Sequence, residues 1–386
     1  MGGLTKDDLK DLVAFRHELH RHPELSGQEH ETARRVVAAL QPLNPAHIVT
    51  DLGGHGVAAV FEGKERGPTV LFRAELDALP IQEISAVPWA SLVPGKGHLC
   101  GHDGHMSMLM GLGRLIARAP VARGRLVLMF QPAEEDGSGA RAVVADPAFA
   151  AIAPDWAFAI HIEPGKPFGH VSTRAGLINC ASQGLIIRLA GKTAHAASPE
   201  DGVSPALAVA ELIPALSGLG AGGKLDDAFT LATVTHVRIG APSFGIAPAE
   251  AEIYVTLRTA HDAAMADMAQ KARGLVMGIA QSHGLGLSFE VRDDFAASIN
   301  NADATDIAVA AMRAIGVVSG SEGLPMRASE DFGVFGQGAK AAMLCLGPGE
   351  DYAALHNPDY DFPDDLIPVG CAIFERIARD LLGRGT

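Results

Sequence analysis

Residues 97–105 read GHLCGHDGH, and this short stretch contains five side chains that can bind a metal ion: His98, Cys100, His102, Asp103 and His105. The whole chain has 16 histidines in 386 residues, so a window of this size would hold fewer than one by chance. Thiolate and imidazole together suit a borderline-soft ion such as Zn²⁺, while carboxylate also accommodates Mn²⁺ or Co²⁺. Cys100 and His102 differ by two positions, so both can point into one loop cavity. The stretch therefore predicts a metal site.

Two adjacent glutamates, Glu134 and Glu135, follow a predicted strand and could have two different roles in catalysis. One would bind the metal, and the other would take a proton from a water molecule and deliver it to a leaving group. A bound cation lowers the pKa of its water toward ~7, which makes hydroxide available at neutral pH. His161, at the end of another strand, and His356, beyond a Gly-rich loop, are further candidates for the same site.

Each candidate also has a purely structural interpretation. Asp103 could cap the following helix, Cys100 could be a small buried apolar residue, and His161 could be a hydrogen-bonded core histidine. The glutamate pair could lie in a solvated loop. His98 and His105 are expected to have structural or supporting roles. The joint occurrence of these residue types at strand ends and in loops, flanked by Gly or Pro, favours the metal site.

The elements that must position these residues alternate between strands and helices. The first forty residues predict two helices, with Thr5 and Asp8 forming a capping box at the start of the first. Apolar strands are predicted at 70–72, 126–130, 157–162 and 341–346, and helices at 106–119 and 366–382. This alternation indicates an α/β sheet flanked by helices, in which ligands bind beyond the carboxyl ends of the strands.

The pattern changes in the middle of the chain. Strands at 184–189, 229–238, 250–257 and 285–291 and helices at 203–216 and 260–282 occur in the order β-α-β-β-α-β, the split ferredoxin-like unit. We therefore predict one α/β catalytic domain built from residues 1–180 and 295–386, with a small domain of residues 181–294 inserted between them.

Composition and charge restrict the partners. Hydrophobic residues are 48% and charged residues 20%, which is ordinary for a globular enzyme. The net charge of −14, without a basic cluster, argues against nucleic acid and anionic membrane. The sequence contains neither a signal-peptide pattern nor an apolar run of spanning length. Four scattered cysteines predict reduced thiols and a cytoplasmic location.

Seven stretches of the chain together resemble the M20 metallopeptidase family, in order and approximate spacing: LHRHPELSGQEHET, RAELDALP, CGHDGH, FQPAEE, AHAASPEDGVSP, SEDF and LHNPDYDF. Within the family they are similar to the amidohydrolase branch, which hydrolyses N-acyl amino acids, hippurate and indole-acetyl amino acids. The resemblance covers essentially the whole chain. It implies a Zn-peptidase-like catalytic domain that holds two metal ions, with a ferredoxin-like lid that often dimerises.

The resemblance also implies roles for individual residues. The metal ligands of the family match Cys100, His102, Glu135, His161 and His356, and its general base matches Glu134. Asp77 matches a residue that orients groups of the active site. The cofactors implied are two divalent ions per chain, Zn or Mn, with Co or Ni as alternatives.

Three positions of the lid bear on the substrate. His195 resembles the histidine that contacts the scissile carbonyl oxygen, often across a dimer interface, and could serve as an oxyanion donor. Arg258 matches an arginine that binds the substrate carboxylate, but Gly245 stands where the family has an asparagine that helps to hold substrate. Half of this clamp is therefore expected to be missing.

The sequence predicts a metal-dependent amidohydrolase that cleaves an amide bond of a small N-acyl or N-aroyl amino acid, acting as a homodimer through its lid. Two alternatives stay open. One is a dipeptidase of the same family. The other, from a different class, is a metal- or ligand-binding module that keeps the fold without turnover, although Glu134 and the five ligand positions all carry competent residues.

Overall fold

The computed structural model describes residues 3–385, which form two compact units. Unit 1 contains the described residues up to Ile178, Ser298–Leu324 and those from Glu330 onward, and unit 2 contains Asn179–Ala297 and Pro325–Ser329. Among these residues, no helix combines the length and apolar character that crossing a membrane requires.

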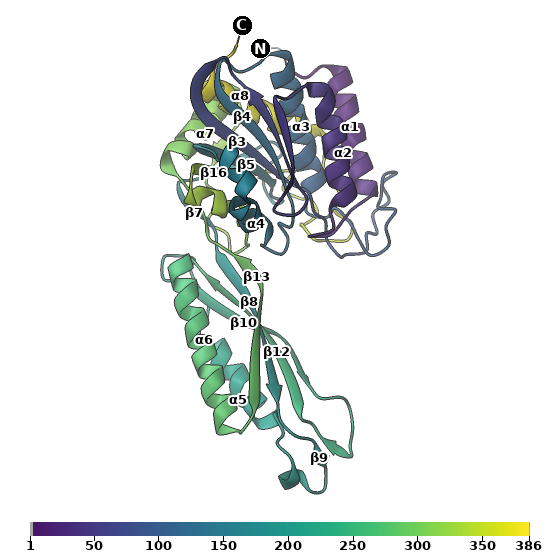
Figure 1. Ribbon diagram of the computed structural model, residues 1–386, viewed down its shortest axis with the longest axis vertical. Helices are drawn as coiled ribbons and strands as arrows, with labels where there is room; N and C mark the ends of the chain where they lie inside the picture. Colours follow the sequence, from purple (N-terminus) through teal and green to yellow (C-terminus); the bar gives the residue numbers. More distant parts are fainter. Residues whose placement is uncertain (1–2, 386) are drawn as a thin grey trace. The chain divides into compact units, whose positions relative to one another are not determined.

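Unit 1 has a mixed sheet with helices packed against it (Figure 1). Its main helices are α1 (Lys6–Arg21), α2 (His30–Leu40), α3 (His102–Arg118), α4 (Gly139–Ala145), α7 (Ala302–Ala314) and α8 (Ile367–Leu382). Its sheet contains β1 (His47–Leu52), β2 (Gly56–Glu62), β3 (Glu65–Glu75), β4 (Arg123–Gln131), β5 (Trp156–Ile162), β6 (Val171–Ser172), β15 (Ser319–Gly320) and β16 (Lys340–Leu346). The short strands β7 (Gly176–Asn179) and β14 (Ser298–Asn300) pair separately.

The centre of the sheet is parallel, and this decides where the site lies. The strand order is β1-β2-β4-β3-β5-β16-β6-β15, and β3 pairs in parallel with β4 and β5, as β5 does with β16. These four strands end at Glu75, Gln131, Ile162 and Leu346. Their carboxyl ends therefore share one edge, and the candidate residues of the loops that follow are brought toward it.

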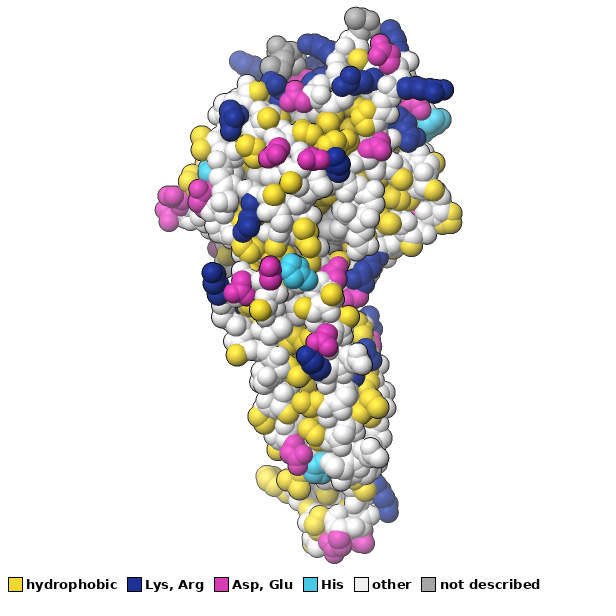
Figure 2. All heavy atoms as spheres, turned by 90° about the vertical axis from the view of Figure 1, so that its left-hand side faces the viewer, with side chains coloured by type: hydrophobic (Ala, Val, Ile, Leu, Met, Phe, Trp, Pro, Cys, Tyr) yellow, Lys and Arg dark blue, Asp and Glu magenta, His cyan; other side chains and the backbone are white. Residues whose placement is uncertain are grey.

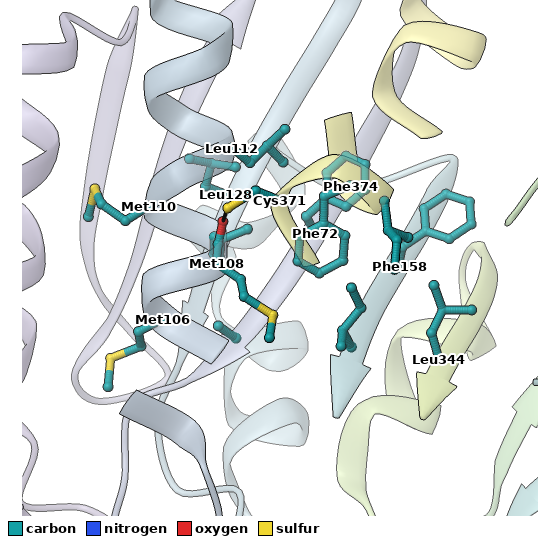
Figure 3. Packing of buried hydrophobic residues seen from close by; sticks show 14 of the residues in the cluster. Phe72, Met106, Met108, Met110, Leu112, Leu128, Phe158, Leu344, Cys371 and Phe374 are labelled. Carbon is teal, nitrogen blue, oxygen red and sulfur yellow. Dashed lines mark hydrogen bonds between the residues drawn. The ribbon is translucent and has the colours of Figure 1, made fainter. Parts of the chain in front are cut away.

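The core beside the sheet is formed largely by α3 and α8, which both pack on β3 (Figure 3). The two helices approach closely because Gly111 faces Cys371, and a Cβ at Gly111 would lie 2.3 Å from the Cys371 sulfur. The thiol of Cys371 donates a hydrogen bond to the carbonyl oxygen of Met108 at 3.1 Å. This packing holds α3, which contains the end of the predicted metal-binding motif in its first turn.

Unit 2 contains a four-stranded antiparallel sheet with two helices on one face (Figure 1). Its elements are β8 (Ala181–Ala190), β9 (Ala194–His195), α5 (Ala206–Ser217), β10 (Thr230–Ile239), β11 (Ile246–Ala247), β12 (Glu250–Thr259), α6 (Asp262–Ser282) and β13 (Gly286–Phe295). The sheet order β10-β12-β8-β13 leaves β10 and β13 at the edges. The main elements follow the predicted β-α-β-β-α-β order.

The helical side of unit 2 exposes apolar groups among its polar ones (Figure 2). Leu207 and Ile213 of α5 are 71% and 37% exposed, and Met277 of α6 is 57% exposed.

The predicted fold class, an α/β domain with an inserted ferredoxin-like unit, is confirmed by this architecture. The two N-terminal helices and the capping box of Thr5 and Asp8 are also as predicted. One boundary differs at a functionally important place: α3 begins at His102, four residues before the predicted start.

Candidate active site

The GHLCGHDGH stretch forms a loop that turns into α3 at Gly101. This residue has a φ of 86°, and a Cβ there would lie 2.9 Å from Ile162 and 3.0 Å from the Tyr360 hydroxyl, so only glycine fits. Cys100 stands just before the turn, and His102 is the first residue of the helix. Asp103 is buried within the first turn rather than at the N-cap, so its predicted capping role is wrong.

In His102 and in His161, the ring nitrogen Nδ1 donates a hydrogen bond to a backbone carbonyl, which leaves a lone pair on Nε2. The Nδ1 of His102 donates to the carbonyl oxygen of Asp77 at 2.8 Å, and the Nδ1 of His161 donates to that of Ile162 at 2.7 Å. The Nε2 of His161 therefore faces Cys100 with its lone pair, 3.6 Å from the sulfur. The Nε2 of His102 is buried without a hydrogen-bond partner and lies 3.8 Å from both Glu134 and Glu135. This tautomer is the one that a metal ligand requires.

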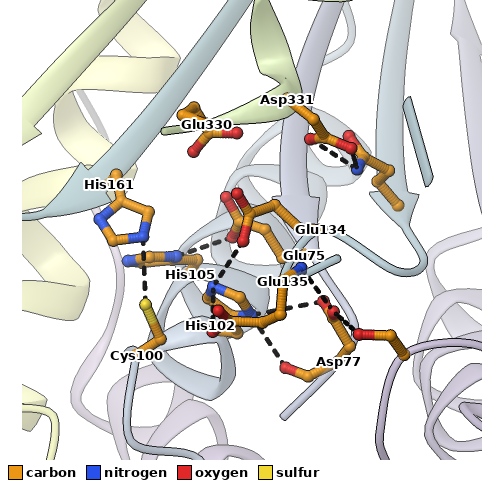
Figure 4. A network of polar contacts seen from close by, with 12 residues as sticks. Glu75, Asp77, Cys100, His102, His105, Glu134, Glu135, His161, Glu330 and Asp331 are labelled. Atoms are coloured by element: carbon orange, nitrogen blue, oxygen red, sulfur yellow. Dashed lines mark hydrogen bonds and ion pairs between the residues drawn. The ribbon is translucent and has the colours of Figure 1, made fainter. Parts of the chain in front are cut away.

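The glutamate pair lies in a tight turn after β4 and points toward the same place (Figure 4). Glu134 is buried and Glu135 is largely buried, so the solvated-loop alternative is wrong. One oxygen of Glu135 is buried without a partner, and the other lies 3.6 Å from the Nε2 of His356. His356 has a φ of 67°, and its backbone N–H donates to the carbonyl oxygen of Leu99, which ties the 356 loop to the Cys100 loop.

All five predicted ligands fall into two groups that share Cys100. One group is Cys100, His102 and His161, and the other is Cys100, Glu135 and His356; within each group the ligand atoms lie within 4.8 Å of one another. His102, Glu134 and Glu135 form a further group with the same spacing.

The buried acidic groups of this cluster favour the binding of a cation. Burial, together with Glu135 and Glu134, raises the pKa of the Cys100 thiol well above its usual range. Burial also raises the pKa of Glu134 well above its usual range, and the neighbouring Glu330 and Glu135 add to this effect. Buried acceptors that converge without donors are costly unless a positive charge lies among them. The donor set, one thiolate with imidazoles and carboxylates, fits divalent ions.

His105, in contrast, is closed to a metal. Its Nε2 accepts a hydrogen bond from the backbone N–H of Ile162 at 3.0 Å, so its Nδ1 carries the proton and donates to Glu75 at 2.7 Å. Both ring nitrogens are occupied, which agrees with the supporting role expected from the sequence.

Comparison with known proteins identifies the family. The model of Peptidase family M20/M25/M40 matches residues 71–380. This chain belongs to peptidase family M20. An N-acetylcysteine deacetylase of Bacillus subtilis is 28% identical over 371 residues, which cover 95% of this chain and 96% of the relative. A hippurate hydrolase of Campylobacter jejuni is 28% identical over 370 residues, with the same two coverages.

A solved structure adds the metal content of a relative. The Bacillus subtilis YXEP protein, described as a dinuclear metal-binding peptidase of the M20 family, has a TM-score of 0.80 and 27% identity, covering 98% of this chain and 99% of its own. As an M20 member, this protein is a metal-dependent hydrolase acting on carbon–nitrogen bonds, and the neighbour supports two divalent ions at its centre.

In this M20 chain, Asp77 contacts both the histidine and the glutamate sides of the site. One oxygen of Asp77 accepts the backbone N–H of Glu135 at 2.9 Å and the Ser26 hydroxyl at 2.8 Å. The other oxygen lies 3.5 Å from the Nδ1 of His102. These contacts agree with the orienting role that the resemblance implies.

A second layer of charged residues was not predicted. Arg73 is fully buried and donates to Glu75, to Glu330 at 2.8 Å and to Asp331 at 2.7 Å. Glu134, Glu330 and Asp331 form another close group, so Arg73 holds two carboxylates near Glu134. The motifs RAELDALP and SEDF contain these residues, but nothing in their spacing indicates that they form one ion-pair network.

The three lid positions of this M20 chain do not meet within unit 2. Gly245 and His195 lie together, because β9 pairs with β11 and the N–H of Ala196 donates to the carbonyl oxygen of Gly245. Arg258 lies near the other end of β12, where it donates to Ser329 and to the carbonyl oxygen of Arg327, both at 2.7 Å. About 26 Å of strand separates the two ends, at ~3.3 Å per residue. Positions 245 and 258 of one chain therefore cannot form one clamp, which corrects that expectation.

Proposed function

We propose that this protein hydrolyses the amide bond of an N-acyl or N-aroyl amino acid, with two divalent ions, Zn²⁺ or Mn²⁺, and with Glu134 as general base. The observation that carries the proposal is the convergence of the unpartnered His102 Nε2 and Glu135 Oε1 with the Cys100 sulfur, beside the buried carboxylate of Glu134. Hydrolysis requires such a centre, whereas a module that only maintains the fold does not.

The two groups of ligand atoms divide the ions between them. Cys100, His102 and His161 would hold one ion, and Cys100, Glu135 and His356 would hold the other. When bound, such ions polarise a carbonyl group and lower the pKa of water. They would also stabilise the thiolate and the carboxylates that burial disfavours.

Glu134 would move the proton. Its carboxylate lies 3.8 Å from the open nitrogen of His102, and Glu330, held by Arg73, disfavours its ionised form. A carboxylate of raised basicity suits the removal of a proton from the attacking water and its delivery to the leaving amine nitrogen. Glu135, whose N–H is held by Asp77, would serve as ligand.

His195 has the protonation pattern of an oxyanion donor. The backbone N–H of Ala197 donates to its Nδ1 at 3.0 Å, so in the neutral ring the Nε2 carries the proton and is free to donate. Because His195 and Gly245 lie at the opposite end of the lid sheet from Arg258, we propose a homodimer through the lid in which they serve the partner's substrate. The edge position of β10 and the exposed Leu207 and Ile213 support this arrangement.

Two features bear on the substrate and the location. Arg258 is the cation in the lid proposed to bind a substrate carboxylate, and it would have to leave Ser329 and Arg327 to do so. A dipeptide would in addition need an acidic partner for its free amine. The carboxylates grouped with Glu134, those of Glu330 and Asp331, are already paired with Arg73, so we favour the acyl amino acid. All four cysteines are buried and unpaired, which supports the proposed cytoplasmic location.

A hydrolysis screen tests the proposal. Enzyme reconstituted with Mn²⁺, Zn²⁺ or Co²⁺ is assayed on N-acetyl, N-benzoyl and indole-acyl amino acids, beside dipeptides and simple amides. We expect kcat/KM to be highest for acyl amino acids and to vanish after chelation. Gly245→Asn should improve common N-acetyl amino acids by ~10-fold or somewhat more, because the asparagine amide, presented by the partner's lid, would add a hydrogen bond to the substrate carboxylate of about 1.5–3 kcal/mol, and each ~1.4 kcal/mol is tenfold. A preference for dipeptides would overturn the assignment of the substrate.

A further inference from the structure

The turn that carries the glutamate pair has an unusual backbone at the residue just before it. Ala133 has a φ of 50°, in the left-handed region that residues with a Cβ seldom adopt, and it is buried. Such a conformation persists only when its surroundings hold it in place. The carbonyl oxygen of Ala133 accepts from the N–H of Gly139, which closes the turn on one side. The N–H of Ala133 must be satisfied from outside the turn.

Glu29 supplies that partner from the N-terminal region. One carboxylate oxygen, Oε1, accepts the N–H of Ala133 at 2.8 Å and the N–H of Gly27 at 2.9 Å, and the side chain is fully buried. Glu29 is the N-cap residue of α2, but its side chain makes no capping hydrogen bond. Glu24 performs that task, because its carboxylate accepts the N–H and the hydroxyl of Thr32 at 2.7 and 2.9 Å. The side chain of Glu29 is thereby free to reach the glutamate turn.

The same N-terminal segment reaches the turn a second time. Ser26 donates to Asp77, and the same oxygen of Asp77 accepts the N–H of Glu135. Glu29 therefore holds the backbone before Glu134, and Asp77 holds the backbone after it. Each of these two carboxylates also accepts a hydrogen bond from the segment 26–29.

We propose that Glu29 is a positioning residue for the hydrolytic reaction: its Oε1 holds the strained backbone of Ala133 and so aims Glu134 as base and Glu135 as ligand. This inference rests on the proposed function. It predicts that the acceptor oxygen matters and the negative charge does not. Burial, with a contribution from Asp77, raises the pKa of Glu29 to about 7, and Oε1 remains an acceptor in either protonation state.

The test compares Glu29→Ala with Glu29→Gln, which keeps the acceptor oxygen and removes the charge. Zn²⁺ affinity is measured by competition with a chelating dye in the absence of substrate, and kcat and KM are measured on the best substrate of the screen. Glu29→Ala should weaken Zn²⁺ binding about 10–100-fold, the usual effect of losing an outer partner, and lower kcat with little change in KM. Glu29→Gln should stay within about threefold of wild type on both measures.

Glu24→Ala is the matched control, because it removes two hydrogen bonds from the same segment without touching the glutamate turn. It should lower the melting temperature as Glu29→Ala does, yet keep wild-type Zn²⁺ affinity and kcat. The proposal is overturned if Glu29→Ala binds Zn²⁺ like wild type, or if Glu29→Gln is as impaired as Glu29→Ala. A wild-type protein that binds no Zn²⁺ or Mn²⁺ would instead refute the proposed function.

Discussion

Two buried polar clusters meet at the first turn of α3, and adjacent residues point into different ones. His102 faces the open cluster of Cys100, Glu134, Glu135 and His161, where unpaired lone pairs converge (Figure 4). Asp103 faces the paired cluster, in which opposite charges lie against each other: Arg16, His20, Glu83, Asp103 and Asp361. Both clusters contain histidines and carboxylates, so these residue types alone do not identify a metal site.

The paired cluster needs no ion. The Nε of Arg16 lies 2.8 Å from Asp103, and another of its nitrogens contacts Asp361. His20 places one ring nitrogen 2.8 Å from Asp103 and the other 3.2 Å from Glu83. Because carboxylates only accept, both nitrogens must carry protons, and His20 is an imidazolium. A cluster whose acceptors already have donors is structural, and one whose acceptors lack them is a site for a cation.

The largest expected effect concerns the base of the open cluster. Glu134→Gln should lower kcat by ~10²–10⁴-fold and retain metal, because it removes proton transfer only. Glu135→Gln should instead lose metal affinity. Steady-state kinetics and metal analysis on both variants check this. An exchange of the two phenotypes would reverse our assignment of base and ligand.

Neutralising one carboxylate in each cluster should have opposite effects on stability. With a chelator present, Glu134→Gln should raise the free energy of unfolding, because burial and Glu330 already disfavour its charge. Asp103→Asn should lower it by about 3–5 kcal/mol, since Arg16 then loses its closest buried partner. Urea unfolding measures both. If the two variants shifted stability in the same direction, the distinction between the clusters would fail.

Sequence patterns predict the open cluster far better than the paired one. Its members lie in recognisable motifs at the start of α3 and at the ends of β4 and β5, and the central parallel strands bring their carboxyl ends to one edge of the sheet. The partners of Arg16 lie 87 and 345 positions away, and no local periodicity connects them. The same holds for Arg73 with Glu330 and for Glu29 with Ala133.

Sequence patterns mislead where local rules compete with tertiary contacts. The sequence pattern predicts too late a start for α3 because Gly101 and the residues after it resemble a loop, whereas Gly101, with a left-handed backbone, is the N-cap of the helix. The family resemblance assigns positions 245 and 258 to one clamp, but the strand predicted between them, β12, is extended and holds the two positions apart within one chain.

The charge of His20 makes the stability of the paired cluster depend on pH. Burial would lower its pKa, but hydrogen bonds with Asp103 and Glu83 outweigh this and raise it to about 9. The folded protein thus binds this proton more tightly than the unfolded chain does. The stabilisation is complete below pH ~6.5 and is lost as the pH rises through about 9, a change of about 3 kcal/mol. Urea unfolding of wild type and His20→Gln between pH 6 and 10 checks this. If the free energy of unfolding changed with pH equally in the two proteins, the prediction would be contradicted.

The smallest effect is expected at His98, which belongs to neither cluster. Its side chain is buried, and neither ring nitrogen has a hydrogen-bond partner among the residues that the structure describes. Burial lowers its pKa to about 3, so the ring is neutral, and its centroid lies 6.4 Å from that of His20. Removing a buried polar group that has no partner costs little, because no hydrogen bond is lost.

His98→Leu, similar in volume, should therefore change the free energy of unfolding by less than about 1 kcal/mol and leave metal content and kcat unaltered. His102→Leu is the matched variant within the same motif and should abolish metal binding. A loss above about 2 kcal/mol in His98→Leu would mean that bound water links His98 to one of the clusters. If the change stays within about 1 kcal/mol, the three histidines of this short motif have three distinct roles: the Nε2 of His102 faces the metal site, both nitrogens of His105 are hydrogen-bonded, and His98 has a partner in neither cluster.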